Sequence, residues 1–143
     1  MKIFTHVEEE KDKSLVGLVL VGDHNKIYQQ VQFDINANKF EASMIGIKRA
    51  LLFVDNNKPL YCNDNIMIYS NLNNYNDNLN LENRVLRDEY INKFKCKHNQ
   101  SIELNYKPVK DENKEFMNIA QILVNVHKRQ QYALSLSNKG NSK

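Results

Sequence analysis

The sequence has little of the residues that mark specialised protein classes. Its 143 residues include four glycines, two prolines and two cysteines, and no tryptophan. Collagen-like chains, mucin-like chains and small disulfide scaffolds are therefore excluded. Cys62 and Cys96 are 34 positions apart and form no CxxC pair. The sequence thus offers no ligand set for a structural zinc site.

Long apolar runs are also missing. The first apolar segment, Lys2 to Val7, runs directly into three glutamates, which is unlike a secretory signal. The longest apolar run, Leu15 to Val21, contains Gly17 and is far shorter than the ~20 residues that cross a bilayer. We therefore expect a cytoplasmic protein with no membrane partner.

The small positive charge is unevenly distributed. The net charge is +3, and the last 17 residues contain four basic residues and no acid, so residues 1–126 carry a net charge of −1. A chain of this length can bury roughly two-thirds of its unfolded surface without a metal or a disulfide. We expect one domain over residues 1–136 and a flexible basic tail over residues 137–143. Such a tail alone is weak support for a nucleic-acid partner.

Apolar segments, and in the third case alternation of apolar and polar residues, predict three strands at the start of the chain. They cover Ile3 to Val7, Leu15 to Val21, and Lys26 to Phe33. The last two are joined by the turn residues Gly22 to Asn25, which is typical of a β-hairpin.

The period then changes to that of a helix. Apolar residues from Phe40 to Val54 recur every three or four positions, with Asn36 or Asn38 as the N-cap. The next strand should lie parallel to the first strand through a βαβ crossover. The remaining predicted elements are a strand over Ile66 to Ser70, a helix over Leu81 to Lys97, a strand over Ser101 to Tyr106 and a helix from Asn113 to about Tyr132. The order βββαβαβα predicts an α/β three-layer fold with a five-stranded mixed sheet and helices on both faces.

Four sequence blocks carry a family resemblance. Ile3 to His6 is similar to an I-F-T-D strand, and Asn38 to Ala42 is similar to the start of an N-N-R-A-E-L helix. Met67 to Leu72 is similar to an I-Y-T-D-S strand end, and Asn113 to Ala120 to an N-E-x-A-D-x-L-A helix start. In this order the blocks resemble the ribonuclease H type 1 domain, also found in reverse transcriptases, over Lys2 to about Arg129.

The resemblance implies a specific chemistry and shows where the chain departs from it. The family hydrolyses the RNA strand of an RNA/DNA hybrid with two divalent metal ions held by four carboxylates, one from each block. At these four places the chain has His6, Glu41, Asn71 and Met117, with Asn118 next to Met117 if the alignment slips by one. Only Glu41 is acidic, and hard cations need charged oxygen ligands. We expect no metal cofactor and no two-metal hydrolysis.

Two alternatives remain open for these residues. Glu115 and Asp111 are the best substitutes for the missing carboxylates, and with Glu41 they would make a Mg²⁺ or Mn²⁺ dependent hybrid ribonuclease with a rearranged site. The competing interpretation is that these acids cap helix N-termini. His6 beside Glu41 could form an acid/base pair, or a polar pair that fills a former metal site.

A basic segment that also contains acidic residues is the candidate nucleic-acid surface. It contains aromatic residues and acids besides the basic residues Arg84, Arg87, Lys93, Lys95 and Lys97. In relatives with a basic protrusion, a corresponding region grips the hybrid duplex. We therefore expect a catalytically inactive domain that binds an RNA/DNA hybrid, another structured nucleic acid or a protein partner, with the metal-dependent ribonuclease as the alternative.

Overall fold

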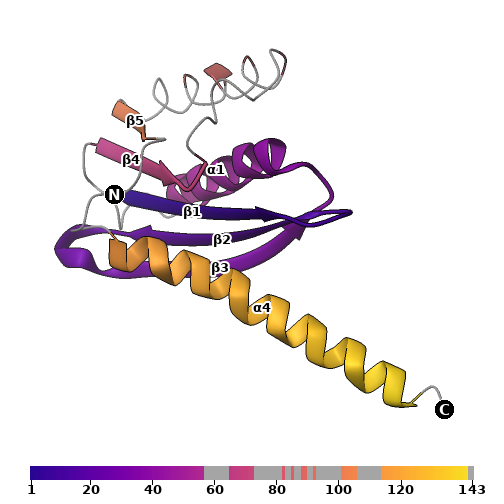
Figure 1. The fold of residues 1–143 in the computed structure, drawn as a ribbon. Helices are drawn as coiled ribbons and strands as arrows, with labels where there is room; N and C mark the ends of the chain where they lie inside the picture. Colours follow the sequence, from indigo (N-terminus) through magenta and orange to yellow (C-terminus); the bar gives the residue numbers. More distant parts are fainter. Residues whose placement is uncertain are drawn as a thin grey trace.

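The computed structural model describes residues 1–56, 65–72, 101–105 and 114–141, together with positions 82, 85, 88, 89 and 92. Strands and helices alternate along the chain in an α/β pattern (Figure 1). The strands are β1 (Lys2–Glu9), β2 (Ser14–Val21), β3 (Ile27–Ile35), β4 (Asn65–Ser70) and β5 (Ser101–Asn105). The helices are the short 3-10 helix η1 (Asp23–Asn25) and the α-helices α1 (Lys39–Asn56) and α4 (Lys114–Asn141).

The strands form one mixed sheet in the order β3-β2-β1-β4-β5. The pairs β1·β2 and β2·β3 are antiparallel, and β1·β4 and β4·β5 are parallel. The parallel pairing of β4 with β1 confirms the predicted crossover through α1, with Thr5 opposite Ser70 at the end of the pairing. The predicted hairpin turn is also confirmed, since His24 and Asn25 adopt left-handed φ angles of 58°.

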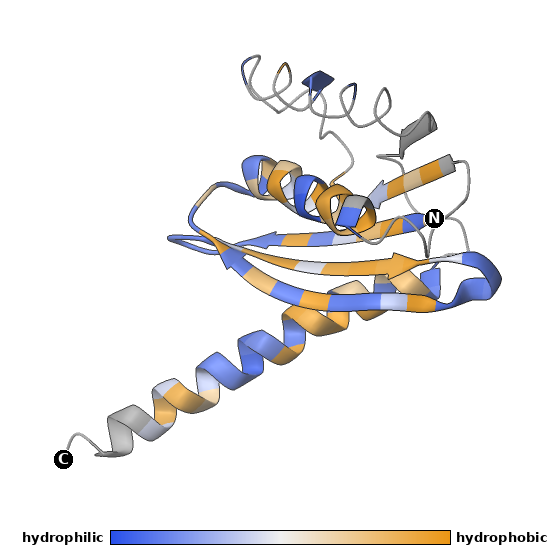
Figure 2. Cartoon of the chain, turned by 180° about the vertical axis from the view of Figure 1, so that it is seen from behind, coloured by the Kyte–Doolittle hydropathy of each residue, from blue (hydrophilic) through white to orange (hydrophobic). Residues whose placement is uncertain are grey.

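The two long helices cover opposite faces of the sheet. Alternate residues of a strand point to opposite faces, and in β1 Ile3 packs in a cluster with α1, whereas Phe4 packs in a cluster with α4. Every residue of β2 is buried. In Figure 2 the middle of the sheet is therefore largely orange, whereas β3 at the edge alternates between orange and blue.

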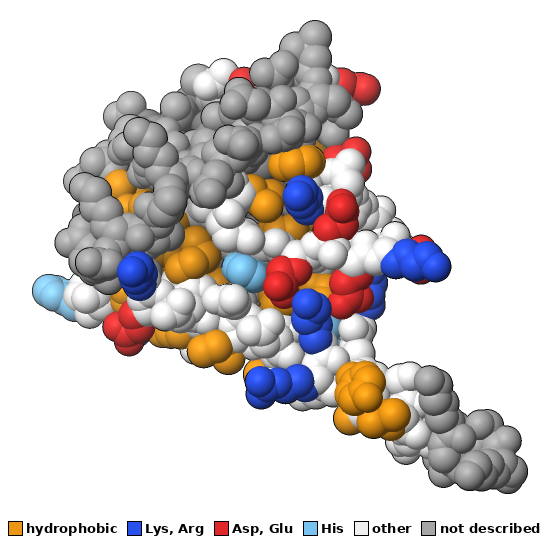
Figure 3. Space-filling model, in the orientation of Figure 1, with side chains coloured by type: hydrophobic (Ala, Val, Ile, Leu, Met, Phe, Trp, Pro, Cys, Tyr) orange, Lys and Arg blue, Asp and Glu red, His pale blue; other side chains and the backbone are white. Residues whose placement is uncertain are grey.

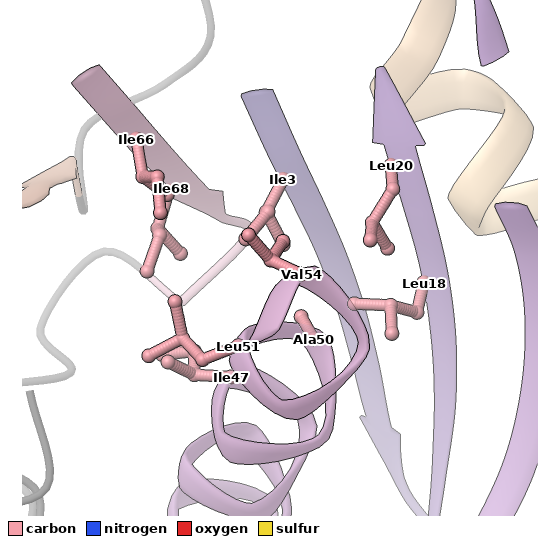
Figure 4. Close-up of a cluster of buried hydrophobic side chains, with 9 residues drawn as sticks. All are labelled: Ile3, Leu18, Leu20, Ile47, Ala50, Leu51, Val54, Ile66 and Ile68. Carbon is pink, nitrogen blue, oxygen red and sulfur yellow. The ribbon is translucent and has the colours of Figure 1, made fainter. Parts of the chain in front are cut away.

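The cluster beneath α1 is the largest of the three apolar clusters among the described residues. Residues one helical turn apart on α1 interlock with branched side chains from three strands (Figure 4). Burial of this kind contributes roughly 1.5 to 3 kcal/mol for each large aliphatic side chain. The buried members are Ile3, Leu18, Leu20, Ile47, Ala50, Leu51, Val54, Ile66 and Ile68.

The start of α1 is fixed by two side chains. Asn38 is the N-cap, because its Oδ1 accepts the backbone N–H of Phe40 at 3.0 Å and that of Glu41 at 2.9 Å. The carboxylate of Glu9 accepts the backbone N–H of Lys39 at 2.9 Å. Glu9 thus stabilises the positive end of the helix dipole.

Helix α4 is longer than the sequence predicted. It continues from Lys114 to Asn141 and so includes most of residues 137–143. The prediction that the helix ends near Tyr132 is wrong, because adding turns to a formed helix is far easier than starting one. The flexibility of the tail stays a prediction.

The predicted helix over residues 81–97 falls mostly outside the described residues, although the described positions 82, 85, 88, 89 and 92 are helical. None of the described helices is both long and apolar enough to span a membrane.

A close backbone approach seats α4 on the sheet. A Cβ atom added at Gly17 in β2 would overlap the carbonyl oxygen of Ala120 in α4 and would lie 2.9 Å from its carbonyl carbon. The residues on the same side of α4, one turn before and after Ala120, are Phe116 and Val124, and both are buried. Gly17 is therefore the point at which α4 touches the sheet with its backbone.

We expect Gly17→Ala to destabilise the protein by about 1 to 3 kcal/mol, the usual cost of overfilling a packed interior. The measurement is the free energy of unfolding from urea titration. Gly46→Ala in α1 is the matched control, because its added Cβ would meet its nearest neighbours at 3.4 to 3.9 Å. That control should be neutral or more stable, since alanine favours a helix over glycine. Equal effects of the two substitutions would contradict the close approach.

Candidate functional site

Two of the four family positions lie side by side at the ends of parallel strands. His6 follows Thr5 in β1, and Asn71 follows Ser70 in β4, directly after the last paired residues of the two strands. The backbone N–H of Asn71 donates to the carbonyl of Thr5 at 3.4 Å, which extends the strand pairing by one step. The parallel pairing of β1 with β4 thus brings the backbones of these two positions together.

The other two positions lie on the two helices. Glu41 is in the first turn of α1, and its neighbour Ala42 is buried in a cluster with Val7, against which Leu72 also packs. Glu41 therefore lies near the same end of the sheet as Asn71. Met117 is in the first turn of α4 and packs against the apolar cluster on the opposite face.

The side chain of Asn71 is bound to the backbone of the neighbouring strand. Its Oδ1 accepts the N–H of Val7 at 2.9 Å, and its Nδ2 donates to the carbonyl of Val7 at 3.0 Å. Only an amide satisfies both groups, because a carboxylate accepts hydrogen bonds and cannot donate one when ionised. Asn71 thus acts as a clamp between β1 and β4.

His6 is buried on the face that α4 covers. It is 8% exposed and lies opposite Gly17 in the β1·β2 pairing. Its Nε2 has no hydrogen-bond partner among the described residues, and the closest carboxylate oxygen, of Glu8, is 3.9 Å away. Burial lowers the pKa of His6, opposed by the carboxylate of Glu8 and assisted by the ammonium group of Lys128. His6 is therefore held in its neutral form near pH 7.

An ion pair joins the end of β1 to α4. Lys128 Nζ lies 3.4 Å from Glu8 Oε2. Figure 3 shows side chains of both charges gathered on this side of the molecule. The pair is partly exposed, so its contribution to stability is small. It nevertheless makes Glu8 a positioning group for α4.

His6 and Glu41 lie on different elements, and the acid/base pair between them stays a prediction. The charged groups that act on His6 are Glu8 and Lys128, and Glu41 is on α1, which covers the other face. The reason is the strand period of two residues, which places His6 with Phe4 rather than with Thr5.

The predicted substitute carboxylates do not gather in the part of the chain that is described. Glu115 is exposed in the first turn of α4, whereas Asp111 lies outside the described residues. Among the described residues, no group of three or more histidine, cysteine or acidic side chains could hold a metal ion. The basic candidates Arg84, Arg87, Lys93, Lys95 and Lys97 also lie outside the described residues.

A polar cluster that the sequence did not predict joins β3 to α4. Its centre is Asp34, which accepts hydrogen bonds from Lys13 and Gln32, each at 2.8 Å. His127 Nε2 lies 3.2 Å from the same carboxylate, and Gln131 Nε2 lies 3.5 Å from it. Partial burial by itself would raise the pKa of Asp34, but these hydrogen bonds outweigh it and lower the pKa. No local pattern reveals the cluster, because Asp34 and His127 are 93 positions apart.

Solved structures share this fold at low sequence identity. Ribonuclease H1 from Halobacterium salinarum is 16% identical, with a TM-score of 0.60 and coverage of 87% of this chain and 93% of that chain. LC11 ribonuclease H1 in complex with an RNA/DNA hybrid is 13% identical, with a TM-score of 0.65 and coverage of 87% and 93%. The foamy viral protease-reverse transcriptase in complex with double-stranded DNA is 12% identical, with a TM-score of 0.60 and coverage of 87% and 90%.

These likenesses establish the fold. No protein-family model matches the sequence, and a search of curated proteins found no match. The chain has an α/β fold of the ribonuclease H type, and the resemblance seen in the four sequence blocks is confirmed at the level of the fold.

We expect Asn71→Asp to lower the free energy of unfolding at pH 7 by about 1 to 3 kcal/mol, because it removes the donor to Val7 and places a carboxylate against a carbonyl oxygen. Protonation of the new carboxyl below about pH 4 should recover part of the loss. Asn118→Asp is the control, since Asn118 is exposed near the start of α4, where a negative charge is favourable. A neutral Asn71→Asp would refute the clamp.

The lowered pKa of His6 predicts a pH-dependent stability. Below the unfolded pKa of 6.5, the unfolded chain binds a proton that the folded chain does not yet accept. The free energy of unfolding should therefore decline as the pH falls from 6.5 toward the folded pKa, with no contribution from His6 above that range. Urea titrations between about pH 5 and 8 measure this slope. His6→Gln should flatten it, and an unchanged slope would show that another group is responsible.

Proposed function

We propose that this chain, which has a ribonuclease H-like fold, is a catalytically inactive nucleic-acid-binding domain whose partner is an RNA/DNA hybrid. The observation that carries the proposal is the clamp formed by Asn71. Both polar atoms of its amide are bound to the backbone of Val7, at the place where the family resemblance implies a metal-binding carboxylate. A residue used in this way supports strand pairing instead of metal binding.

The residues at the other places do not fit a two-magnesium centre. Mg²⁺ is bound by charged oxygen ligands, whereas the thioether of Met117 has almost no affinity for it and imidazole prefers softer metals. His6 is directed toward the face under α4 and is buried there. Glu41 alone would leave two dications at close spacing without the negative charge that stabilises them. No hydrolytic step through metal ions is therefore assigned to this chain.

The nucleic-acid part of the proposal rests on the likeness to proteins of this fold. LC11 ribonuclease H1 is a structural neighbour that was solved with an RNA/DNA hybrid bound. A duplex is recognised mainly by its shape and its phosphates, so a domain of this shape can bind a hybrid after losing the carboxylates that cleave it. The basic segment Arg84, Arg87, Lys93, Lys95 and Lys97 is the proposed phosphate contact.

We expect fluorescence anisotropy to show binding of a labelled RNA/DNA hybrid to the full chain, with affinity that falls between about 50 and 200 mM salt. Replacing Lys93, Lys95 and Lys97 together by Gln should weaken binding and reduce the salt slope by about 1 for each lysine that contacts a phosphate. A charge-matched control replaces the exposed residues Lys11, Lys26 and Lys48 by Gln and should leave the slope nearly unchanged.

The same samples test the absence of catalysis. Incubation with Mg²⁺ or Mn²⁺ should leave the RNA strand intact on a denaturing gel. Cleavage that disappears in Glu41→Gln would overturn the inactive assignment and favour the ribonuclease with a rearranged site. Absence of affinity for hybrid, duplex RNA and single strands at low salt would overturn the nucleic-acid assignment and leave a protein partner.

A further inference from the structure

Helix α4 has two apolar sides, and only one of them is used by the fold. Its inner side buries Phe116, Ala120 and Val124 against the sheet. A second row of mostly apolar side chains lies on the side of α4 that faces away from these residues. This second row is exposed. This outer stripe consists of Ile122, Val126, Arg129, Ala133 and Leu136.

The spacing of the outer stripe is that of a helix-pairing seam. Its members are separated alternately by four and three residues, which is the heptad pattern of two helices that pack side by side. Ile122 is 55% exposed, Val126 43% and Leu136 50%. The stripe from Ile122 to Leu136 is about 21 Å long at 1.5 Å for each residue. The small side chain of Ala133 lets a second helix approach closely.

The last turns of α4 extend past the sheet. The final described contact of α4 with the sheet is that of Gln131 with Asp34, and the helix continues to Asn141 away from the strands (Figure 1). Orange side chains gather on this projecting part in Figure 3. Tyr132 is 67% exposed and Leu134 is 64% exposed.

Charge decides which kind of partner fits the stripe. From Phe116 to Asn141, α4 contains His127, Lys128, Arg129 and Lys139 and no acidic residue. A second copy of α4 would bring further cations beside Arg129 with no acid to pair with them. A lipid surface favours a broad apolar face with cations along both borders, whereas this stripe is narrow and has its one cation, Arg129, in the middle.

We propose that the outer stripe and the projecting end of α4 form a docking site for an acidic amphipathic helix of another protein. The apolar residues of that helix pack between Ile122 and Leu136, and an acidic residue pairs with Arg129. Lys128 is directed toward Glu8 on the sheet side, so Arg129 is the cation that selects the partner. This proposal does not depend on the proposed nucleic-acid contact.

The probe is a pair of synthetic peptides of about three heptads with leucine and isoleucine at the seam positions. One carries glutamate at the flanking positions and the other carries lysine. Anisotropy of each labelled peptide is measured against the full chain. We expect the acidic peptide to bind at least about tenfold more tightly than the basic one, and Arg129→Glu to reverse this preference.

A double variant locates the site. Val126→Gln with Leu136→Gln should weaken the acidic peptide about tenfold without changing the free energy of unfolding, because both side chains are exposed. The control replaces Gln121 and Ser135 by Ala, which are exposed positions of α4 outside the stripe, and should not change the affinity.

Other outcomes would overturn the proposal. No binding, equal binding of the two peptides, or unchanged binding by the double variant would each refute it. Sedimentation of the chain alone tests a second copy: a dimer that the double variant abolishes would make that copy the occupant. Binding to phosphatidylserine vesicles that the double variant abolishes would make a lipid surface the occupant.

Discussion

The missing side chain at Gly17 sets the position of α4, and much of the structure follows from that contact. The backbone of α4 at Ala120 lies directly on β2, and residues one turn away are then brought to fixed partners. Phe116 meets the ring of Phe4, with 5.5 Å between ring centres. Farther along the helix, His127 reaches Asp34 and Lys128 reaches Glu8. The same contact covers His6 and leaves the opposite side of the helix in solvent.

On the proposed function, three of the four family positions are structural residues. Carboxylates that converge without a metal repel one another, and burial raises their cost further. Neutral residues remove that repulsion: Asn71 joins two strands, Met117 packs against an apolar cluster, and burial favours the neutral form of His6. On the proposed function, the end of the sheet is therefore stabilised by the same replacements that remove the metal ligands.

Much of the fold was predictable because its signals are local. The apolar pattern of the first three strands, the turn before β3 and the cap at Asn38 each depend on a few neighbouring residues. The end of α4 was not predictable in this way, because residues near Lys139 carry no apolar pattern and continue the helix only from the turns that precede them. The four candidate site residues came from the sequence blocks and stay a prediction.

The sequence by itself determined the types and the order of the described elements, because residue type and period are local properties. Only the tertiary structure decided which groups meet. Asn71 binds Val7 across 64 positions, and His127 binds Asp34 across 93. Such pairs depend on strand register and on the seating of α4 at Gly17. The exposed stripe of α4 was likewise decided by tertiary structure, because a helix with two apolar sides does not itself specify which side the sheet covers.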